Sequence, residues 1–287
     1  MEKEIPDRLA TLGHPQRLDL FRLLMRRYPD RVPAGELAEA LSLKPSTLSA
    51  YLNALMRAGL VTQERSGTSL RYSMNMPEVR RTFDYLLNDC CRGRPDICAP
   101  AHTLPQTLPQ TLQGGPDMAD RKYNALFICV GNSARSIFAE TILRDMAGDR
   151  FTVHSAGTRP FSELNPFALE VLKSKGHDVS ALRAKHVEEF TAPGAPVMDF
   201  VFTVCDRAAN EDCPAWQGQP VSAHWGTPDP VLATGTDAQK SLAFQQAYGA
   251  LKNRITAFAA LPVETLDRVS LQAAVDEIGR AADEAEA

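Results

Sequence analysis

The segment from Cys129 to Ser136 constrains the fold of this chain more than any other stretch. Five residues separate the cysteine from Arg135, and they are Val130, Gly131, Asn132, Ser133 and Ala134. The apolar run 125–128 precedes this segment like a buried strand, and residues 137–143 follow it with helical spacing. A glycine-containing loop between strand and helix binds oxyanions, because backbone N–H groups and the positive helix end point into it. The segment therefore predicts an α/β domain with an anion site.

Cys129 and Arg135 supply the chemistry that this loop predicts. The planar guanidinium of Arg135 is suited to hold two oxygens of a bound anion. In the same positive field we expect Cys129 to be a thiolate, which is the nucleophilic form of cysteine. The alternative, a buried structural cysteine, leaves the glycine and the arginine without a role.

Strand and helix patterns alternate through the rest of the second half. We expect further strands at 151–155, 199–204 and 221–224, and helices at 136–147, 166–175 and 237–261. This order predicts a parallel sheet flanked by helices on both faces, with the site at the carboxyl ends of the strands. Residues 264–287 are expected to form a partly frayed acidic helix.

Length and composition limit the class of protein. The chain has 287 residues, enough for two domains. No apolar stretch approaches the ~20 residues that span a membrane, and we expect no secretory signal at the start. Six cysteines in two groups of three do not resemble a disulfide scaffold, so we expect a cytoplasmic protein. Residues 1–100 carry 15 Lys and Arg against 12 Asp and Glu, a balance that weakly favours a polyanionic partner.

The first hundred residues predict a winged helix-turn-helix domain. Apolar residues at helical spacing run through 7–28 with a break at 13–15, and a short helix follows at 36–41. A further helix runs to about residue 58, with Ser46 as its expected N-cap. Residues 61–65 and 70–74 alternate like the two strands of a hairpin.

This arrangement predicts DNA binding. A helix with small polar side chains at its N-terminal end fits the major groove, and arginines on a hairpin reach the backbone or minor groove. The alternative is a winged helix that contacts only other proteins. The expected DNA contacts are Ser46, Thr47, Ser49, Ala50, Tyr51 and Asn53 on the helix, with Arg65 and Arg71 on the hairpin.

Three stretches of this half carry a family resemblance. LGHPQRLDLFRLL, LAEALSLKPSTLSAYLNALMRAGLV and RSGTSLRYSMN resemble the ArsR-type metal- and arsenic-sensing repressors, over about residues 6–90. The resemblance implies a homodimer that binds operator DNA and releases it when the sensed ion binds. A helix expected at 78–89 would make the dimer contact. Tyr51 departs from the family, which often has histidine there.

Cys90, Cys91 and Cys98 follow that helix. Three thiolates without a nearby histidine pair suit a soft, three-coordinate ion better than zinc, which prefers four ligands. We therefore expect a sensor site for arsenite or antimonite, and some ArsR-type repressors resemble this arrangement. Two alternatives remain open: zinc or another thiophilic metal held with His102 or a partner chain, and thiols with no role in metal binding.

Residues 99–120 separate the two halves. They contain the repeat TLPQTLPQ, which is too short and too rich in proline to form a core, so a flexible linker is expected. A docking motif is the alternative. The expected organisation is a DNA-binding domain over 1–98, a linker over 99–120, a catalytic domain over 121–263 and a helical tail over 264–287.

The second half carries its own resemblance. FICVGNSARSIFAE, VHSAGT, FVFTVCD and HWGTPDP, within about residues 123–262, are similar to arsenate reductases of the low-molecular-weight tyrosine-phosphatase fold. The resemblance implies that loop 130–136 binds arsenate and that Cys129 attacks it while Asp229 protonates the departing oxygen. It also implies that Ser136 and Asn132 shape the loop and hydrogen-bond the Cys129 thiolate. Cys205 and then Cys213 would pass the resulting disulfide to the surface, where reduced thioredoxin would reduce it. No tightly bound cofactor is implied.

A phosphatase acting on phosphotyrosine is the alternative for this domain. Such an enzyme needs Cys129, Arg135 and Asp229 but neither Cys205 nor Cys213. Phosphatases of this fold usually carry a tyrosine directly after the Asp-Pro pair, where this chain has Val231. Together the two resemblances predict an arsenic-responsive repressor fused to an arsenate reductase that retains residual phosphatase activity.

Overall fold

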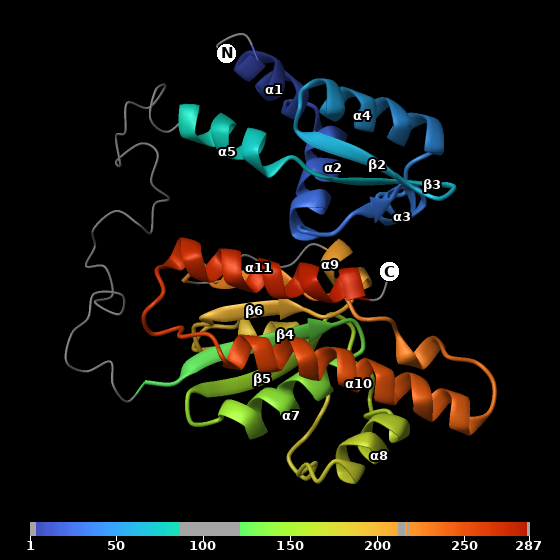
Figure 1. Cartoon of the computed structure of the whole chain (residues 1–287), viewed down its shortest axis with the longest axis vertical. Helices are drawn as coiled ribbons and strands as arrows, with labels where there is room; N and C mark the ends of the chain where they lie inside the picture. Colours follow the sequence, from blue (N-terminus) through green and yellow to red (C-terminus); the bar gives the residue numbers. More distant parts are fainter. Residues whose placement is uncertain (1–3, 87–120, 212–215, 217, 286–287) are drawn as a thin grey trace. The chain divides into compact units, whose positions relative to one another are not determined.

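A computed structural model describes residues 4–86, 121–211, 216 and 218–285 of the chain. The described residues form two compact units (Figure 1). The N-terminal unit comprises residues up to Met25 and those from Arg31 to Arg121, and the C-terminal unit comprises Arg26–Asp30 and the residues from Lys122 onward. Among the described helices, none has both the length and the apolar character required to cross a membrane.

The N-terminal unit has the expected helix-turn-helix and hairpin. Its helices are α1 (Glu4–Leu12), α2 (Pro15–Arg26), α3 (Ala34–Ala40), α4 (Pro45–Arg57) and α5 (Met76–Asp84). Strands β2 (Val61–Ser66) and β3 (Ser69–Met74) form the hairpin, and the two-residue strand β1 (Val32–Pro33) adds to β3. The expected apolar positions of α4, Leu48, Leu52 and Leu55, are all buried.

One local prediction in this unit needs correction, and one strand pairing was not predicted. Ser46 is not the N-cap of α4, because the helix begins one residue earlier with Pro45 at its first position and Lys44 as the cap. Proline is favoured there because its missing N–H has no helical partner in any case. The pairing of Val32 with Tyr72 was also not expected, since a two-residue strand has no alternating pattern to recognise.

The C-terminal unit is built on a parallel sheet. Its strands are β4 (Tyr123–Cys129), β5 (Phe151–Gly157), β6 (Phe200–Thr203) and β7 (Val221–His224), in the order β5-β4-β6-β7. Its helices are α7 (Arg135–Ala147), α8 (Pro166–Ser174), α9 (Asp206–Asn210), α10 (Asp237–Ala259) and α11 (Arg268–Ala285). Two single-turn segments are η4 (Val187–Phe190) and η5 (Pro230–Leu232).

The loop that follows β4 lies at the position where parallel sheets of this kind bind ligands. The chain passes from β4 to β5 on one side and then crosses to β6 on the other, so the order reverses beside β4. Ligands bind outside the carboxyl ends of the strands at such a point. Residues Ala125–Ile128 of β4 are fully buried, which fixes that end firmly.

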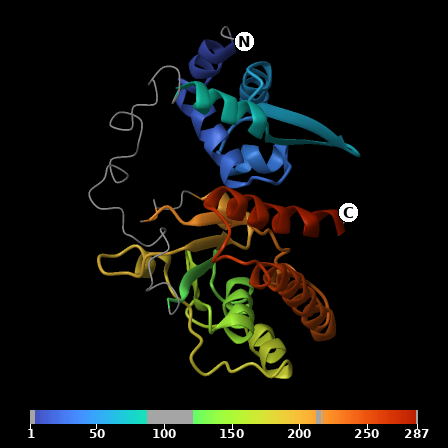
Figure 2. The same cartoon turned by 60° about the vertical axis from the view of Figure 1, so that its left-hand side comes forward.

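Helices cover the sheet and extend its core. Figures 1 and 2 show α7 and α10 on the same side of the sheet, and α11 packs along β7. Phe202 and Trp225 stack with their ring centroids 4.0 Å apart. The helix expected in the tail starts at Arg268, and its Leu271 and Val275 are buried in this same core. Residues beyond 263 are therefore part of the domain's packing.

Candidate active site

The loop between β4 and α7 has its carbonyl groups turned outward. The carbonyl oxygens of Cys129, Val130, Gly131 and Ser133 accept hydrogen bonds from the backbone N–H groups of Thr158, Arg159, Phe161 and Asn165, at 2.9–3.1 Å. A peptide group that directs its oxygen outward directs its N–H the other way. The segment 158–165 thus holds the loop in a shape that can receive an anion, at the positive end of α7.

The sulfur of Cys129 lies at the base of this loop. Its side chain is 3% exposed, and its Sγ lies 2.9 Å from Ser136 Oγ and accepts a hydrogen bond from the backbone N–H of Asn132 at 3.1 Å. Donors around a sulfur stabilise the thiolate over the thiol. Cys129, Asn132 and Ser136 therefore lie together as expected from the sequence.

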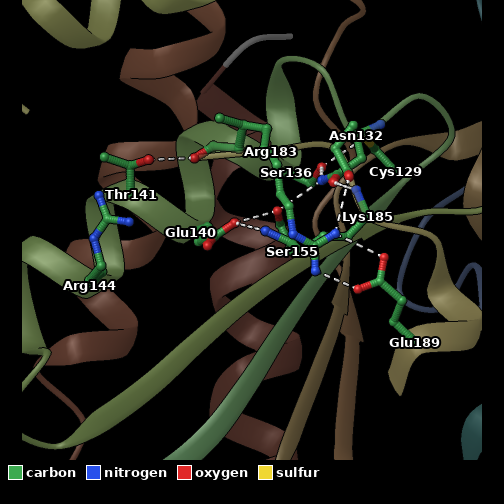
Figure 3. A network of polar contacts seen from close by, with 12 residues as sticks. Cys129, Asn132, Ser136, Glu140, Thr141, Arg144, Ser155, Arg183, Lys185 and Glu189 are labelled. Atoms are coloured by element: carbon green, nitrogen blue, oxygen red, sulfur yellow. Dashed lines mark hydrogen bonds and ion pairs between the residues drawn. The ribbon is translucent and has the colours of Figure 1, made fainter. Parts of the chain in front are cut away.

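Asn132 has a left-handed backbone, with φ of 43°. Asparagine tolerates this conformation better than other residues with a Cβ, because its short side chain forms local hydrogen bonds. Here the side-chain amide donates to Ser136 Oγ and Ser155 Oγ, both at 2.8 Å, and its oxygen accepts from the N–H of Lys185 at 2.7 Å (Figure 3). Both N–H donors and the carbonyl oxygen of this buried amide form hydrogen bonds that fix the loop.

Arg135 and Asp229 meet at the mouth of the site. Arg135 Nη2 lies 2.6 Å from Asp229 Oδ2, and Nη1 donates to the carbonyl of Thr227 at 2.9 Å. The Thr227 hydroxyl in turn accepts a hydrogen bond from the buried Arg254 of α10 at 3.2 Å. The carboxylate is therefore within reach of any oxygen that the guanidinium holds, which is the position required of a general acid.

Gly131 is close to the ring of Phe161. A Cβ added to this glycine would lie 2.5 Å from Phe161 Cε2, so a larger residue would have to displace the ring. The ring is 57% exposed although it packs on the loop. It forms an apolar rim next to the anion site.

Cys205 lies directly behind the loop. Val204 donates its N–H to the Ile128 carbonyl at 2.8 Å, which brings the residues after β6 beside those after β4. Cys205 is 1% exposed and caps α9, with its Sγ accepting from the N–H of Ala208 at 3.4 Å. Burial, together with the neighbouring Cys129, raises the pKa of the Cys205 thiol to about 11. At neutral pH Cys205 is thus a protonated thiol beside Cys129.

Several predictions fall on residues outside the described part of the chain. They concern Cys213 of the expected disulfide relay, the three expected sensor cysteines (Cys90, Cys91 and Cys98) and the expected linker 99–120. The expected dimer helix is described only in part, as α5 and the two residues that follow it. These interpretations stay predictions.

The expected DNA contacts lie on α4 and on the hairpin. Ser46, Ser49, Ala50 and Asn53 are exposed on α4, and Arg65 and Arg71 are exposed on β2 and β3. Thr47 and Tyr51 are half-buried. The Tyr51 hydroxyl donates to Gln16 Oε1 at 2.5 Å, so this side chain links α4 to α2.

Sequence reasoning missed the side chains that support the loop from behind. Ser155, Glu140 and Lys185 connect to Asn132 and to one another but are 15 to 45 residues apart in the sequence. One indication was present, because Ser155 is a polar residue at the carboxyl end of a predicted strand, where parallel sheets place their sites. Glu140 gave no such indication.

Comparison with family models identifies both halves. Residues 124–271 match the model described as low molecular weight phosphotyrosine protein phosphatase, and residues 12–64 match a helix-turn-helix domain. The first match includes the loop, Cys205, Asp229 and the start of α11.

Individual relatives match the C-terminal half. An arsenate reductase of Halalkalibacterium halodurans is 35% identical over 133 residues, which is 46% of this chain and 92% of the relative. An arsenate reductase of Bacillus subtilis has the same identity and coverage. A solved structure titled "An arsenate reductase in oxidized state" is 25% identical with a TM-score of 0.40, and the match covers 48% of this chain and 96% of that one.

Proposed function

This chain belongs to the low molecular weight phosphotyrosine protein phosphatase family, and we propose that its phosphatase-like domain reduces arsenate to arsenite. The observation that carries the proposal is the thiol of Cys205, buried directly beside Cys129. A phosphatase needs one nucleophilic cysteine, whereas a reductase that works through a disulfide needs a second thiol that can pair with the first. The similarity to arsenate reductases supports the same reading.

The proposed reaction uses each group of the site once. Arsenate binds in loop 130–136 with Arg135 on two of its oxygens, and the Cys129 thiolate attacks arsenic as Asp229 protonates the departing oxygen. Cys205, once deprotonated, attacks the Cys129 sulfur, and the electron pair of the broken S–As bond remains on arsenic, which leaves as arsenite. Cys213 then attacks Cys205 and releases the Cys129 thiolate. Thioredoxin, as a dithiol, reduces the remaining disulfide.

The test of this function is a comparison of two assays on the purified full chain. Arsenate reduction is followed with reduced thioredoxin, and hydrolysis of p-nitrophenyl phosphate is followed in parallel. The proposal requires sustained arsenate turnover that depends on thioredoxin. Phosphate-ester hydrolysis without arsenate turnover would favour the phosphatase, for which Cys129, Arg135 and Asp229 already form a sufficient site.

Replacement of Cys213 with serine is expected to allow one turnover and no more. The first disulfide, between Cys129 and Cys205, still forms and releases one arsenite per chain, but no thiol then frees Cys129. A burst of one equivalent in a rapid-quench experiment measures this. Undiminished multiple turnover by this variant contradicts the relay.

The rate of this burst is expected to rise with pH. Because the raised pKa of Cys205 is about 11, only a small fraction is thiolate at pH 7, and that fraction grows about tenfold per pH unit. If disulfide formation limits the burst, its rate increases from pH 7 to pH 9. A burst rate that falls over this range contradicts the assignment of Cys205 as the attacking thiol.

The N-terminal domain is proposed to repress transcription until arsenite binds. Its helix-turn-helix match and the exposed polar residues of α4 support DNA binding, with a homodimer on an operator. Arsenite or antimonite would bind to Cys90, Cys91 and Cys98, so the regulator would respond to the product of the enzyme in the same chain.

Serine substitution of each sensor cysteine is expected to separate DNA binding from release. The variants at Cys90, Cys91 and Cys98 are expected to retain operator affinity, because these cysteines follow the helix-turn-helix in the sequence. Arsenite should no longer release the variant proteins from the operator DNA. Fluorescence anisotropy of a labelled operator with increasing arsenite measures both properties. If all three single variants release DNA normally, the sensor site is elsewhere.

A further inference from the structure

A buried arginine on α10 contacts the part of the chain that carries Asp229. Arg254 is 3% exposed and lies on the face of α10 that also buries Leu251 and Ile255. A charge among apolar side chains is costly unless it forms hydrogen bonds. Here Nη1 of Arg254 donates to Thr227 Oγ1 at 3.2 Å. The helix α10 therefore holds the chain two residues before Asp229.

The hydroxyl of Thr227 both accepts and donates a hydrogen bond. A guanidinium only donates, so Thr227 Oγ1 accepts from Arg254, and its own proton goes to the carbonyl oxygen of Trp225 at 3.2 Å. The two contacts hold the side chain from two directions. The backbone carbonyl of the same residue accepts a hydrogen bond from Arg135 Nη1 at 2.9 Å. Thr227 thus lies between two arginines, one from α10 and one from the anion loop.

The chain from Thr227 to Pro230, called the acid segment here, is stiff. Its sequence is Thr-Pro-Asp-Pro, and each proline ring locks its own φ and restricts the residue before it to an extended backbone. Asp229 has such a backbone, with φ of −79° and ψ of 106°. Few torsions are therefore free between Thr227 and Asp229. A contact that holds Thr227 also holds the Asp229 carboxylate, whose Oδ2 lies 2.6 Å from Arg135 Nη2.

The helix α10 relates the acid segment to the anion loop. It packs along α7, which begins at Arg135, and the two helices lie on the same side of the sheet (Figures 1 and 2). The hydrogen bond from Arg254 therefore connects the acid segment to the helix pair that positions the loop. This connection keeps the Asp229 carboxylate at one distance from an anion bound there.

We propose that Arg254 is a positioning residue for the general acid: it holds Thr227 from α10 and so keeps the Asp229 carboxylate against Arg135, where the leaving oxygen is protonated. Without the guanidinium, the acid segment can move relative to the bound anion. A general acid must be within hydrogen-bond reach of the oxygen that it protonates, so this movement slows catalysis. The inference rests on the proposed role of Asp229 but not on whether the substrate is arsenate or a phosphate ester.

The dependence of ester hydrolysis on the leaving group tests this role in the full chain. The nitro group stabilises p-nitrophenolate, which needs less help from a general acid than phenolate does, so phenyl phosphate is the more sensitive substrate. Arg254→Met keeps an apolar side chain of similar length in the core. It is expected to lower kcat about tenfold for phenyl phosphate and no more than about threefold for p-nitrophenyl phosphate.

Arg150→Met is the matched control for stability. Arg150 donates to the carbonyl oxygens of Ala259 and Leu261 at 2.7 and 2.8 Å, and neither acceptor belongs to the acid segment. The control removes an arginine that holds the other end of α10, so it should lower the melting temperature and leave the ratio of the two ester rates unchanged. Equal losses on both esters in Arg254→Met would reduce Arg254 to a structural residue and overturn the proposal.

Asp229→Asn tests the route of the effect. This variant lacks the acid, so adding R254M should lower its phenyl phosphate rate by less than about twofold. Rate losses that multiply in R254M/D229N would place the effect of Arg254 elsewhere and overturn the proposal. Thr227→Val removes the hydroxyl but keeps the shape of the side chain, and it should change the ester ratio in the same direction. It carries the test if Arg254→Met does not fold, and an unchanged ratio in folded Thr227→Val would also overturn the proposal.

These results can be separated from the test of the reductase. Absence of arsenate turnover in a wild type that hydrolyses both esters would reject the reductase and leave the ester comparison valid. If the wild type reduces arsenate but hydrolyses neither ester, the same variants are compared in arsenate reduction with thioredoxin. Arg254→Met must then lose activity only when Asp229 is present. A wild type inactive on all three substrates would overturn the inference, because Asp229 would protonate no leaving group.

Discussion

Replacement of Cys129 with serine is expected to abolish arsenate reduction. The loop orients its donors toward the atom at this position, with Ser136 Oγ at 2.9 Å and the Asn132 N–H at 3.1 Å. A serine hydroxyl stays protonated in that field, and its oxygen cannot form the disulfide with Cys205 whose formation leaves an electron pair on arsenic. Loss of a nucleophile of this kind lowers kcat by at least about 10⁴-fold. Arsenite release under reduced thioredoxin measures the effect.

The fold and the binding of the anion should survive this change. Serine is only slightly smaller than cysteine. The hydrogen bonds that the loop carbonyls accept from segment 158–165 involve the backbone and not the side chain of residue 129. Phosphate should therefore still raise the melting temperature of the Cys129→Ser variant, and operator binding should match the wild type. Continued arsenate turnover by a folded, phosphate-binding variant would show that another cysteine is the nucleophile.

The anion loop was predictable because its parts are contiguous in sequence. Seven consecutive residues between a strand and a helix determine where Cys129 and Arg135 lie, and β4 and α7 begin and end within two residues of the expected positions. The close contact of Gly131 with the ring of Phe161 could not be predicted in this way, because the ring comes from a segment 30 residues away.

The side chains that support the loop from behind could not be predicted, because they come from distant parts of the sequence. Lys185 and Glu140 are 45 residues apart, and nothing in the sequence indicates that the two side chains meet. Only the tertiary fold turns both inward, where the ion pair becomes part of the site. The N-cap of α4 shows the same limit at short range, because Ser46 is a good cap by type but Pro45 is a better first residue of the helix.

The C-terminal helix α11 has an apolar packed face although its composition is mostly polar. Leu271, Val275 and Ile278 follow helical spacing within an otherwise acidic segment, and the Trp225 indole N–H donates to the Val275 carbonyl at 3.1 Å. A Cβ on Gly279 would lie 2.9 Å from the His224 carbonyl oxygen, so the helix approaches β7 closely. A narrow apolar stripe was thus sufficient to hold α11 against the sheet.

Replacement of Cys205 with alanine is expected to separate reduction from phosphatase chemistry. Arsenate reduction stops at the Cys129–arsenic adduct, because no neighbouring thiol attacks the sulfur, and steady-state turnover falls by at least about 10³-fold. Hydrolysis of p-nitrophenyl phosphate needs only Cys129, Arg135 and Asp229, and it should stay within about threefold of the wild-type rate.

Two further variants make this result interpretable. Cys205→Ser tests whether the small cavity left by alanine matters, and both variants should behave alike if the missing function is the thiol. Asp229→Asn removes the proposed general acid and should lower both activities by about 10²-fold, because each reaction needs a protonated leaving oxygen. If Cys205→Ala reduces arsenate at the wild-type rate, a thiol from outside the site completes the reaction. The burial of Cys205 beside Cys129 would then be a feature of packing alone.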